Sequence, residues 1–187
     1  MPTKDRHITR IFYDGNDGVD ASTNSLQTIS YAHHEVHSGS SFVCTDVQNL
    51  EEATVQWMIT TTDTTKWAHI VFDIDCTGEF LVTITEGADR TGTNLLTCVN
   101  RNRNSSTMPT MVMHRAVSGG TTDGATTMWT HRAGATNSGG QSGSPGGSRG
   151  IEEFILKQNT KYIITIETFA DVYVTFDVDF YEHTSKN

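Results

Sequence analysis

The chain has 187 residues, a formal net charge of −9 and 35% hydrophobic residues, which suits one domain that folds without a disulfide or a metal ion. No apolar run is long enough to cross a membrane, and the acidic balance argues against nucleic acid as the main partner, because phosphate binding needs clustered Lys and Arg. The first ten residues lack the apolar stretch of a signal peptide, so we expect synthesis and retention in the cytoplasm.

The N-terminal residues 1–25 differ from the rest of the chain. They hold four basic side chains, which are followed by a polar stretch rich in Asp, Asn and Gly. This composition predicts an arm, or an edge strand swapped between subunits, over 1–25, followed by a single domain over 26–187. The basic side chains of the arm are Lys4, Arg6, His7 and Arg10.

The remaining residues favour strands over helices. About 30 residues are threonine, whose branched side chain suits a partly exposed strand. Five segments alternate between apolar and polar residues with a period of two, which places successive side chains on opposite faces of a sheet. These segments are 55–60, 70–76, 79–86, 161–167 and 172–181.

Weaker candidate strands lie between these segments, and residues 48–54 could form one helical turn. Glycine-containing turns separate the candidates. So many short strands predict an all-β fold, an antiparallel β-sandwich of the jelly-roll kind. The weaker candidates are 7–13, 26–37, 41–47, 94–100, 110–117, 125–132 and 151–156.

Residues 133–150 are rich in Gly and Ser and predict a long loop that a compact domain does not need. Two interpretations stay open for this loop. It is either a flexible surface loop or a segment that becomes ordered against a neighbouring subunit.

The three cysteines, Cys44, Cys76 and Cys98, are odd in number and widely spaced. That pattern argues against a disulfide framework and against a zinc knuckle. We expect three buried free thiols in a reducing compartment.

The histidine-rich stretch 31–37 is the first candidate for chemistry. On a strand, His33, Glu35 and His37 would share one face, at a spacing at which imidazole and carboxylate could bind zinc or a similar metal. The alternatives are polar residues on an exposed face and a pH-sensitive interface. We adopt the interpretation without a metal or a cofactor.

Two acidic pairs, Asp73 with Asp75 and Asp177 with Asp179, point away from the predicted core. If their strands are neighbours, the four carboxylates could meet and bind calcium. The alternative, which we adopt, is a soluble face or an edge protected by charge.

No familiar catalytic motif is present: the sequence has no GxSxG, HExxH, GxGxxG or Walker-type pattern. We therefore expect no enzyme, although the two acids of a glycosidase need not be close in sequence. Carbohydrate binding would need exposed aromatic side chains. Trp67, Trp129 and Tyr181 are its candidates, whereas Trp57 falls in the core pattern.

A basic run follows one of the weaker strands. Arg101 and Arg103 are two residues apart and could clamp a carboxylate or a phosphate, most plausibly on an acidic protein partner. The alternative is a solvated turn.

Three passages are distinctive as a set: Thr62–His69 (TDTTKWAH), Asn100–Ser105 (NRNRNS) and the C-terminal stretch Ile155–Asn187. Together they resemble a family of small structural proteins of tailed bacteriophages, and the resemblance runs from about His34 to the C-terminus. It implies a virion protein, a capsid decoration or cement protein on the capsid exterior that binds the major capsid protein and its own copies, as a homotrimer.

The alternative within the virion is a tail, fibre or receptor-binding component that binds carbohydrate. The resemblance implies no catalytic residues. The candidate residues for contact with the capsid or with neighbouring subunits are Arg6, Arg10, Arg101, Arg103, Ser142 and Arg149.

Overall fold

The computed structural model describes residues 12–13, 16–17, 31–134 and 153–184. Most of the predicted arm and of the 133–150 loop therefore lie outside the described residues. Within the arm, β1 (Phe12–Tyr13) pairs with β2 (Asn16–Asp17) in an antiparallel hairpin.

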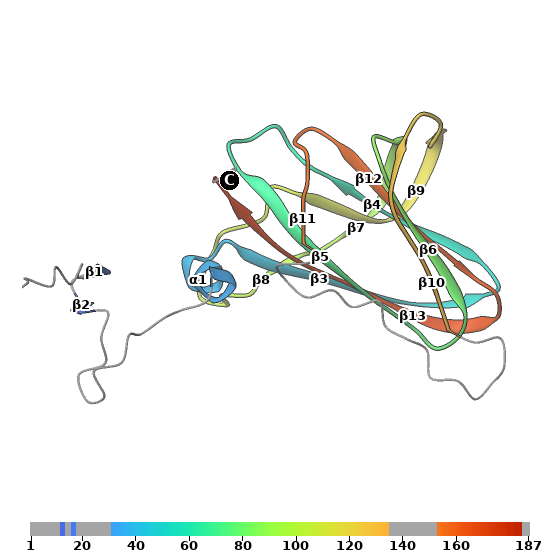
Figure 1. Cartoon of the computed structure of the whole chain (residues 1–187), viewed down its shortest axis with the longest axis horizontal. Coiled ribbons are helices and arrows are strands. Elements are labelled where there is room, and N and C mark those ends of the chain that lie inside the picture. Colours follow the sequence, from blue (N-terminus) through green and yellow to red (C-terminus); the bar gives the residue numbers. More distant parts are fainter. Residues whose placement is uncertain (1–11, 14–15, 18–30, 135–152, 185–187) are drawn as a thin grey trace, which may run out of the picture.

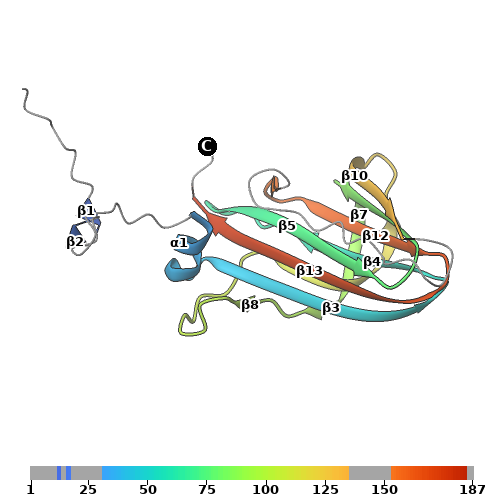
Figure 2. The same cartoon turned by 60° about the horizontal axis from the view of Figure 1, so that its bottom comes forward.

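The described part of residues 31–184 is almost entirely β-structure, with one short helix, α1 (Tyr31–Ser38). All strand pairs are antiparallel, and two sheets pack face to face as two layers (Figures 1 and 2). One sheet has the strand order β11-β5-β13-β3-β8 and the other the order β10-β6-β12-β4-β9-β7. The strands are β3 (Ser41–Glu51), β4 (Thr54–Thr60), β5 (Trp67–Cys76), β6 (Phe80–Glu86), β7 (Asp89–Leu96), β8 (Val99–Asn100), β9 (Val112–Thr121), β10 (Thr126–Ala133), β11 (Phe154–Ile155), β12 (Lys161–Thr168) and β13 (Asp171–His183).

The strand order is that of a jelly roll. When β7, β8 and β9 are set aside, eight strands of the two sheets remain, and one sheet holds the first, eighth, third and sixth of them in that order. The other sheet holds the second, seventh, fourth and fifth, which completes the two interleaved Greek keys of this fold. The insertion β7–β9 widens both sheets, because β9 lies beside β4 and β8 beside β3. The predicted all-β sandwich is confirmed.

The core lies between the two sheets and follows the period-two pattern of the sequence. The five strongly alternating segments are β4, β5, β6, β12 and β13, and their inward side chains are almost completely buried. Trp57 is 0% exposed, as predicted, and stacks on Phe176 with ring centroids 4.7 Å apart. Burial of the apolar side chains along these strands is the main contribution that holds the two sheets together.

Two local predictions are wrong. Residues 31–38 form a helix instead of the predicted strand over 26–37, and the helix ends at Gly39, whose φ is +74°. The predicted helical turn over 48–54 does not form, because β3 pairs with β13 as far as Glu51. Glu52, with a φ of 43°, then turns the chain into β4. There the long partner strand outweighs the local helical preference of the sequence.

The prediction of three free cysteines is also wrong. Cys44 on β3 and Cys98 before β8 form a disulfide, whereas Cys76 is free and buried. Val43 pairs with Val99 across β3 and β8, so the adjacent cysteines come together with Cα atoms 4.4 Å apart. Their separation of 54 residues concealed this pairing in the sequence.

Among the described residues, no helix combines the length and the apolar character that a membrane crossing requires.

Candidate interaction site

Residues 62–67, residues 100–105 and the end of the C-terminal stretch lie at one end of the sandwich, which we call the α1 end. It consists of α1, the 61–66 loop, the 101–111 segment and residues 181–183 of β13, and Figure 2 shows α1 beside the end of β13. Trp67 pairs with His183 across β5 and β13. The Asn102 side chain donates a hydrogen bond to the carbonyl of His37 over 3.2 Å.

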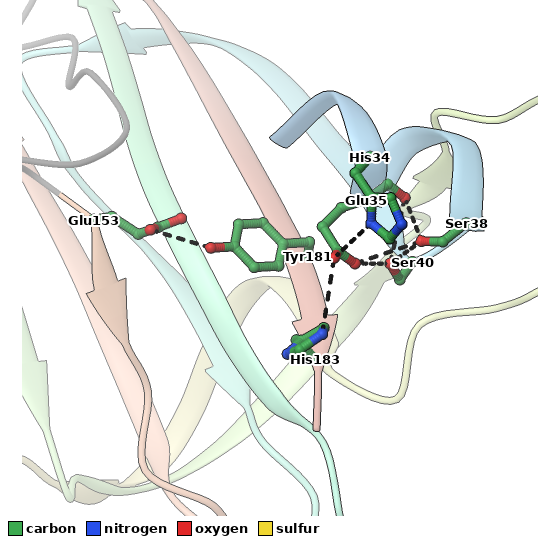
Figure 3. Close-up of polar contacts among 7 residues, drawn as sticks. All are labelled: His34, Glu35, Ser38, Ser40, Glu153, Tyr181 and His183. Atoms are coloured by element: carbon green, nitrogen blue, oxygen red, sulfur yellow. Dashed lines mark hydrogen bonds and ion pairs between the residues drawn. The ribbon is translucent and has the colours of Figure 1, made fainter. Parts of the chain in front are cut away.

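The buried carboxylate of Glu35 fastens α1 to the sandwich (Figure 3). Glu35 is 2% exposed and accepts hydrogen bonds from Ser40 and, over 3.4 Å, from Ser38. Its other oxygen lies 3.4 Å from Nδ1 of His34 and 3.9 Å from Nε2 of His183, at the end of β13. The carboxylate therefore connects the helix to Ser40, just before β3, and to His183, the last residue of β13.

The pKa of Glu35 lies below its ordinary value. Burial alone would raise the pKa, but hydrogen bonds from Ser40 and His34 and the charges of His183 and His34 act against it and prevail. Since these partners favour the ionised form, they stabilise the folded state in which they surround it.

A second buried carboxylate, that of Glu182, holds the 101–111 segment against β13. It accepts hydrogen bonds from the backbone N–H of Thr110 (2.8 Å), the hydroxyl of Thr110 (2.9 Å) and the backbone N–H of Met111 (2.7 Å). Hydrogen bonds to an ionised acceptor are stronger than neutral ones. The segment is thus fixed by its backbone, and several of its side chains, among them Arg103 and Met108, are exposed.

Asn100 connects the same segment to the end of α1. Its side-chain amide donates to the carbonyls of Gly39 (2.8 Å) and Thr107 (3.0 Å), and its side-chain oxygen accepts from the N–H of Asn102 (2.8 Å). The asparagines of NRNRNS thus shape the turn.

The two arginines of the same passage have separate partners within the chain. Arg101 makes an ion pair with Asp179 of β13 over 3.0 Å. Arg103 is exposed and donates to the carbonyl of Asn100 over 3.3 Å. The other four predicted contact residues, Arg6, Arg10, Ser142 and Arg149, lie outside the described residues.

The predicted face of His33, Glu35 and His37 does not exist, because these residues lie on a helix. His33 and His37, four residues apart, are exposed on one side of α1, and their Nε2 atoms are 2.8 Å apart. Glu35 is buried among different partners. The zinc site that a strand would have allowed is therefore wrong.

The two acidic pairs lie on neighbouring strands, as the calcium hypothesis required. Asp73 pairs directly with Asp177, whereas Asp75 pairs with Thr175. Asp179 is engaged by Arg101. Within the described part of the chain, no three His, Cys, Asp or Glu residues form a group that could hold a metal ion.

The aromatic residues proposed for carbohydrate binding do not form an exposed platform. Tyr181 is only 4% exposed, stacks on His69 with centroids 4.6 Å apart, and donates its hydroxyl proton to Glu153 over 3.2 Å (Figure 3). Trp129 is partly buried against the core. The prediction of Tyr181 as an exposed sugar contact is wrong, because its side chain is buried and packs on His69.

One buried polar cluster, around Asp46, was not predicted from the sequence. Asp46 is buried on β3, where it accepts hydrogen bonds from Arg115 (2.6 Å), from the indole N–H of Trp57 (2.8 Å) and from Gln48 (2.9 Å). Arg115 and Gln48 also line an open groove of about 470 Å³ beside β4 and β9. The ion pair joins residues 69 positions apart, which no local motif reveals.

Comparison with known proteins gives no family. No protein-family model matches the sequence, and no curated protein does. The structure of the Gx strain of infectious bursal disease virus shares 9% sequence identity with this chain, at a TM-score of 0.17. That match covers 77% of this chain and 40% of the viral chain, and a likeness at this TM-score carries no argument.

Proposed function

We propose that this protein is a structural protein of a bacteriophage virion, a decoration or cement protein that binds and stabilises the shell of the major capsid protein. The observation that supports this most directly concerns the three passages that resemble phage virion proteins, because they come into contact at or near the α1 end. They are far apart in the sequence, yet Trp67 of the first pairs with His183 of the third, and Arg101 of the second makes an ion pair with Asp179 of the third.

The α1 end has the features of a protein-binding surface. Its backbone is fixed by the buried side chains of Glu35, Glu182 and Asn100, so binding would cost little ordering entropy. Its exposed side chains include Arg103 and Met108, which is 68% exposed. Arg and Met are enriched at protein interfaces relative to the rest of the surface.

The overall charge suits a position on the capsid exterior. A protein with a net charge of −9 is repelled by packaged DNA. It would therefore not compete with the shell for the DNA. We include in the proposal that copies of the chain associate as a homotrimer at symmetry axes of the shell.

The first experiment is the copy number of this chain in purified phage particles, measured by quantitative mass spectrometry against the major capsid protein. A cement protein is expected at a number equal to the shell protein or to a simple symmetric fraction of it. A handful of copies per particle would instead identify a tail or vertex component, and absence from the particle would exclude a virion role.

The contact surface is tested with two variants that each replace an exposed apolar side chain. Met108→Ser at the α1 end is expected to weaken binding to purified shells by about tenfold, which is typical of a residue in a contact. Tyr173→Ser is the control, since Tyr173 is 58% exposed at the start of β13, far along the strand from the α1 end. Equal binding by Met108→Ser and the wild type would place the contact elsewhere.

A further inference from the structure

The exposed histidine pair on α1 has a geometry that a metal ion can use. His33 and His37 are one helical turn apart, and their Nε2 atoms, the outer nitrogens of the two rings, are 2.8 Å apart. At that distance one ring donates a proton to the other, so at least one nitrogen carries a lone pair directed at its neighbour. Both Nε2 atoms present lone pairs once that shared proton has left and each neutral ring carries its proton on Nδ1.

We propose that His33 and His37 form a two-histidine chelating site for a divalent transition-metal ion of the Cu²⁺ or Ni²⁺ type, with water in the remaining positions. Imidazole is a preferred ligand of these ions. The metal would replace the shared proton between the two rings. This proposal does not depend on the proposed virion role.

The separation of the nitrogens favours an ion with ligands at right angles. With metal–nitrogen bonds of about 2.0–2.1 Å, two adjacent ligands at 90° lie about 2.9 Å apart, whereas two ligands of a tetrahedral ion lie about 3.4 Å apart. The observed 2.8 Å matches the first arrangement. Square-planar and tetragonal geometry is typical of Cu²⁺ and Ni²⁺.

The helix is held so that the pair is ready to bind. Glu35 lies between the two histidines in sequence and is anchored in the interior by Ser40 and Ser38. The helix then ends with hydrogen bonds from Gly39 N–H to the carbonyl of Val36 (3.1 Å) and from Ser40 N–H to the carbonyl of Glu35 (3.1 Å).

His37 is in the last turn, where the helix dipole favours positive charge. A cation held by the pair therefore lies at the favourable end of the helix. Among the described residues, no group of three or more metal-ligating side chains includes the pair.

The test is a titration of the full-length protein with NiCl₂, followed by calorimetry, with CuCl₂ used for electron paramagnetic resonance. The wild type is expected to bind one ion at this site, and the Cu²⁺ spectrum to show two nitrogen ligands. His33→Ala and His37→Ala are each expected to weaken binding by at least about tenfold, because one ligand of a chelating pair is lost. Each variant should show a single nitrogen ligand.

His131→Gln is the matched control, since it removes an imidazole from β10, at the edge of the other sheet. Thermal unfolding without metal should be the same for the wild type and both alanine variants, because both side chains are exposed. The proposal is overturned if His33→Ala and His37→Ala bind Ni²⁺ as tightly as the wild type. It is equally overturned if the wild-type Cu²⁺ spectrum shows one nitrogen or if His131→Gln loses binding as they do.

Discussion

The interior of the sandwich and its α1 end are stabilised by different kinds of side chain. In the interior, apolar residues at every second position pack between the sheets, and Trp57 and Phe176 are both 0% exposed. At the α1 end, the buried carboxylates of Glu35 and Glu182 accept hydrogen bonds from loops and from the end of the helix. The interior needs only shape and water exclusion, whereas the α1 end needs each polar partner in place.

This difference predicts two kinds of failure. Loss of an interior side chain should lower the stability of the whole domain, because every strand shares that core. Loss of a carboxylate at the α1 end should loosen the segment that it holds, while the sheets remain folded.

The largest effect is expected from Phe176→Ala. Removal of a buried phenylalanine leaves a cavity and should lower the free energy of unfolding by about 4 kcal/mol, measured by denaturant titration. Tyr173→Ala, three residues earlier on β13 and 58% exposed, should change it by less than about 0.5 kcal/mol. Similar losses in the two variants would show that burial does not distinguish the two faces of β13.

Loss of the disulfide should have a comparable effect. It joins β3 to the insertion across 54 residues of sequence, and the chain-entropy account gives about 4 kcal/mol for a loop of that length. Cys98→Ser should therefore unfold at lower denaturant concentration than the oxidised wild type and should not respond to a reductant. A wild-type protein whose unfolding is unchanged by reductant would argue against the Cys44–Cys98 bond in solution.

Glu182→Ala should cost less, and locally. It leaves the backbone N–H groups of Thr110 and Met111 without their buried acceptor, at a cost of about 2–3 kcal/mol. Hydrogen exchange should accelerate in the 101–111 segment while the amides of β12 stay protected. Glu51→Ala, at an exposed position of β3, is the control, and uniform acceleration across both sheets would contradict a local role for Glu182.

The sequence predicted the interior better than the α1 end, for a physical reason. Alternation with a period of two is a local signal, and it located the long strands and the core position of Trp57. The contacts of Glu35, Asn100 and Cys44 join residues far apart in the chain, so no local pattern could pair them.

A usable signal for the buried carboxylates was nevertheless present. Glu182 occupies the next inward position after Phe180 in the alternation of β13, and Asp46 follows Cys44 in the same way on β3. A charged residue at an inward position predicts a buried polar partner.

The helix at 31–38 was missed because its buried side is formed by an acidic residue, Glu35, so that no apolar stripe marks it.

The smallest effect, and the one most specific to the α1 end, is the pH dependence contributed by Glu35. Its pKa in the folded state is lowered from the ordinary value of 4.5. Above pH 4.5 the carboxylate is ionised in both states, and its contribution to stability is complete. As the pH falls below 4.5, the unfolded chain takes up the proton first, and the contribution is lost through the lowered pKa of the folded state.

Glu35→Gln tests this directly, because glutamine cannot ionise. Both proteins are unfolded by denaturant at a series of pH values. The wild type should be the more stable above pH 4.5, and the difference should shrink as the pH falls below 4.5. Glu51→Gln, on the exposed side of β3, controls for the loss of one acidic group. A difference that grows on acidification would mean that burial, which acts to raise the pKa of Glu35, outweighs Ser40, His34 and His183, and that α1 is fastened by a neutral carboxyl group.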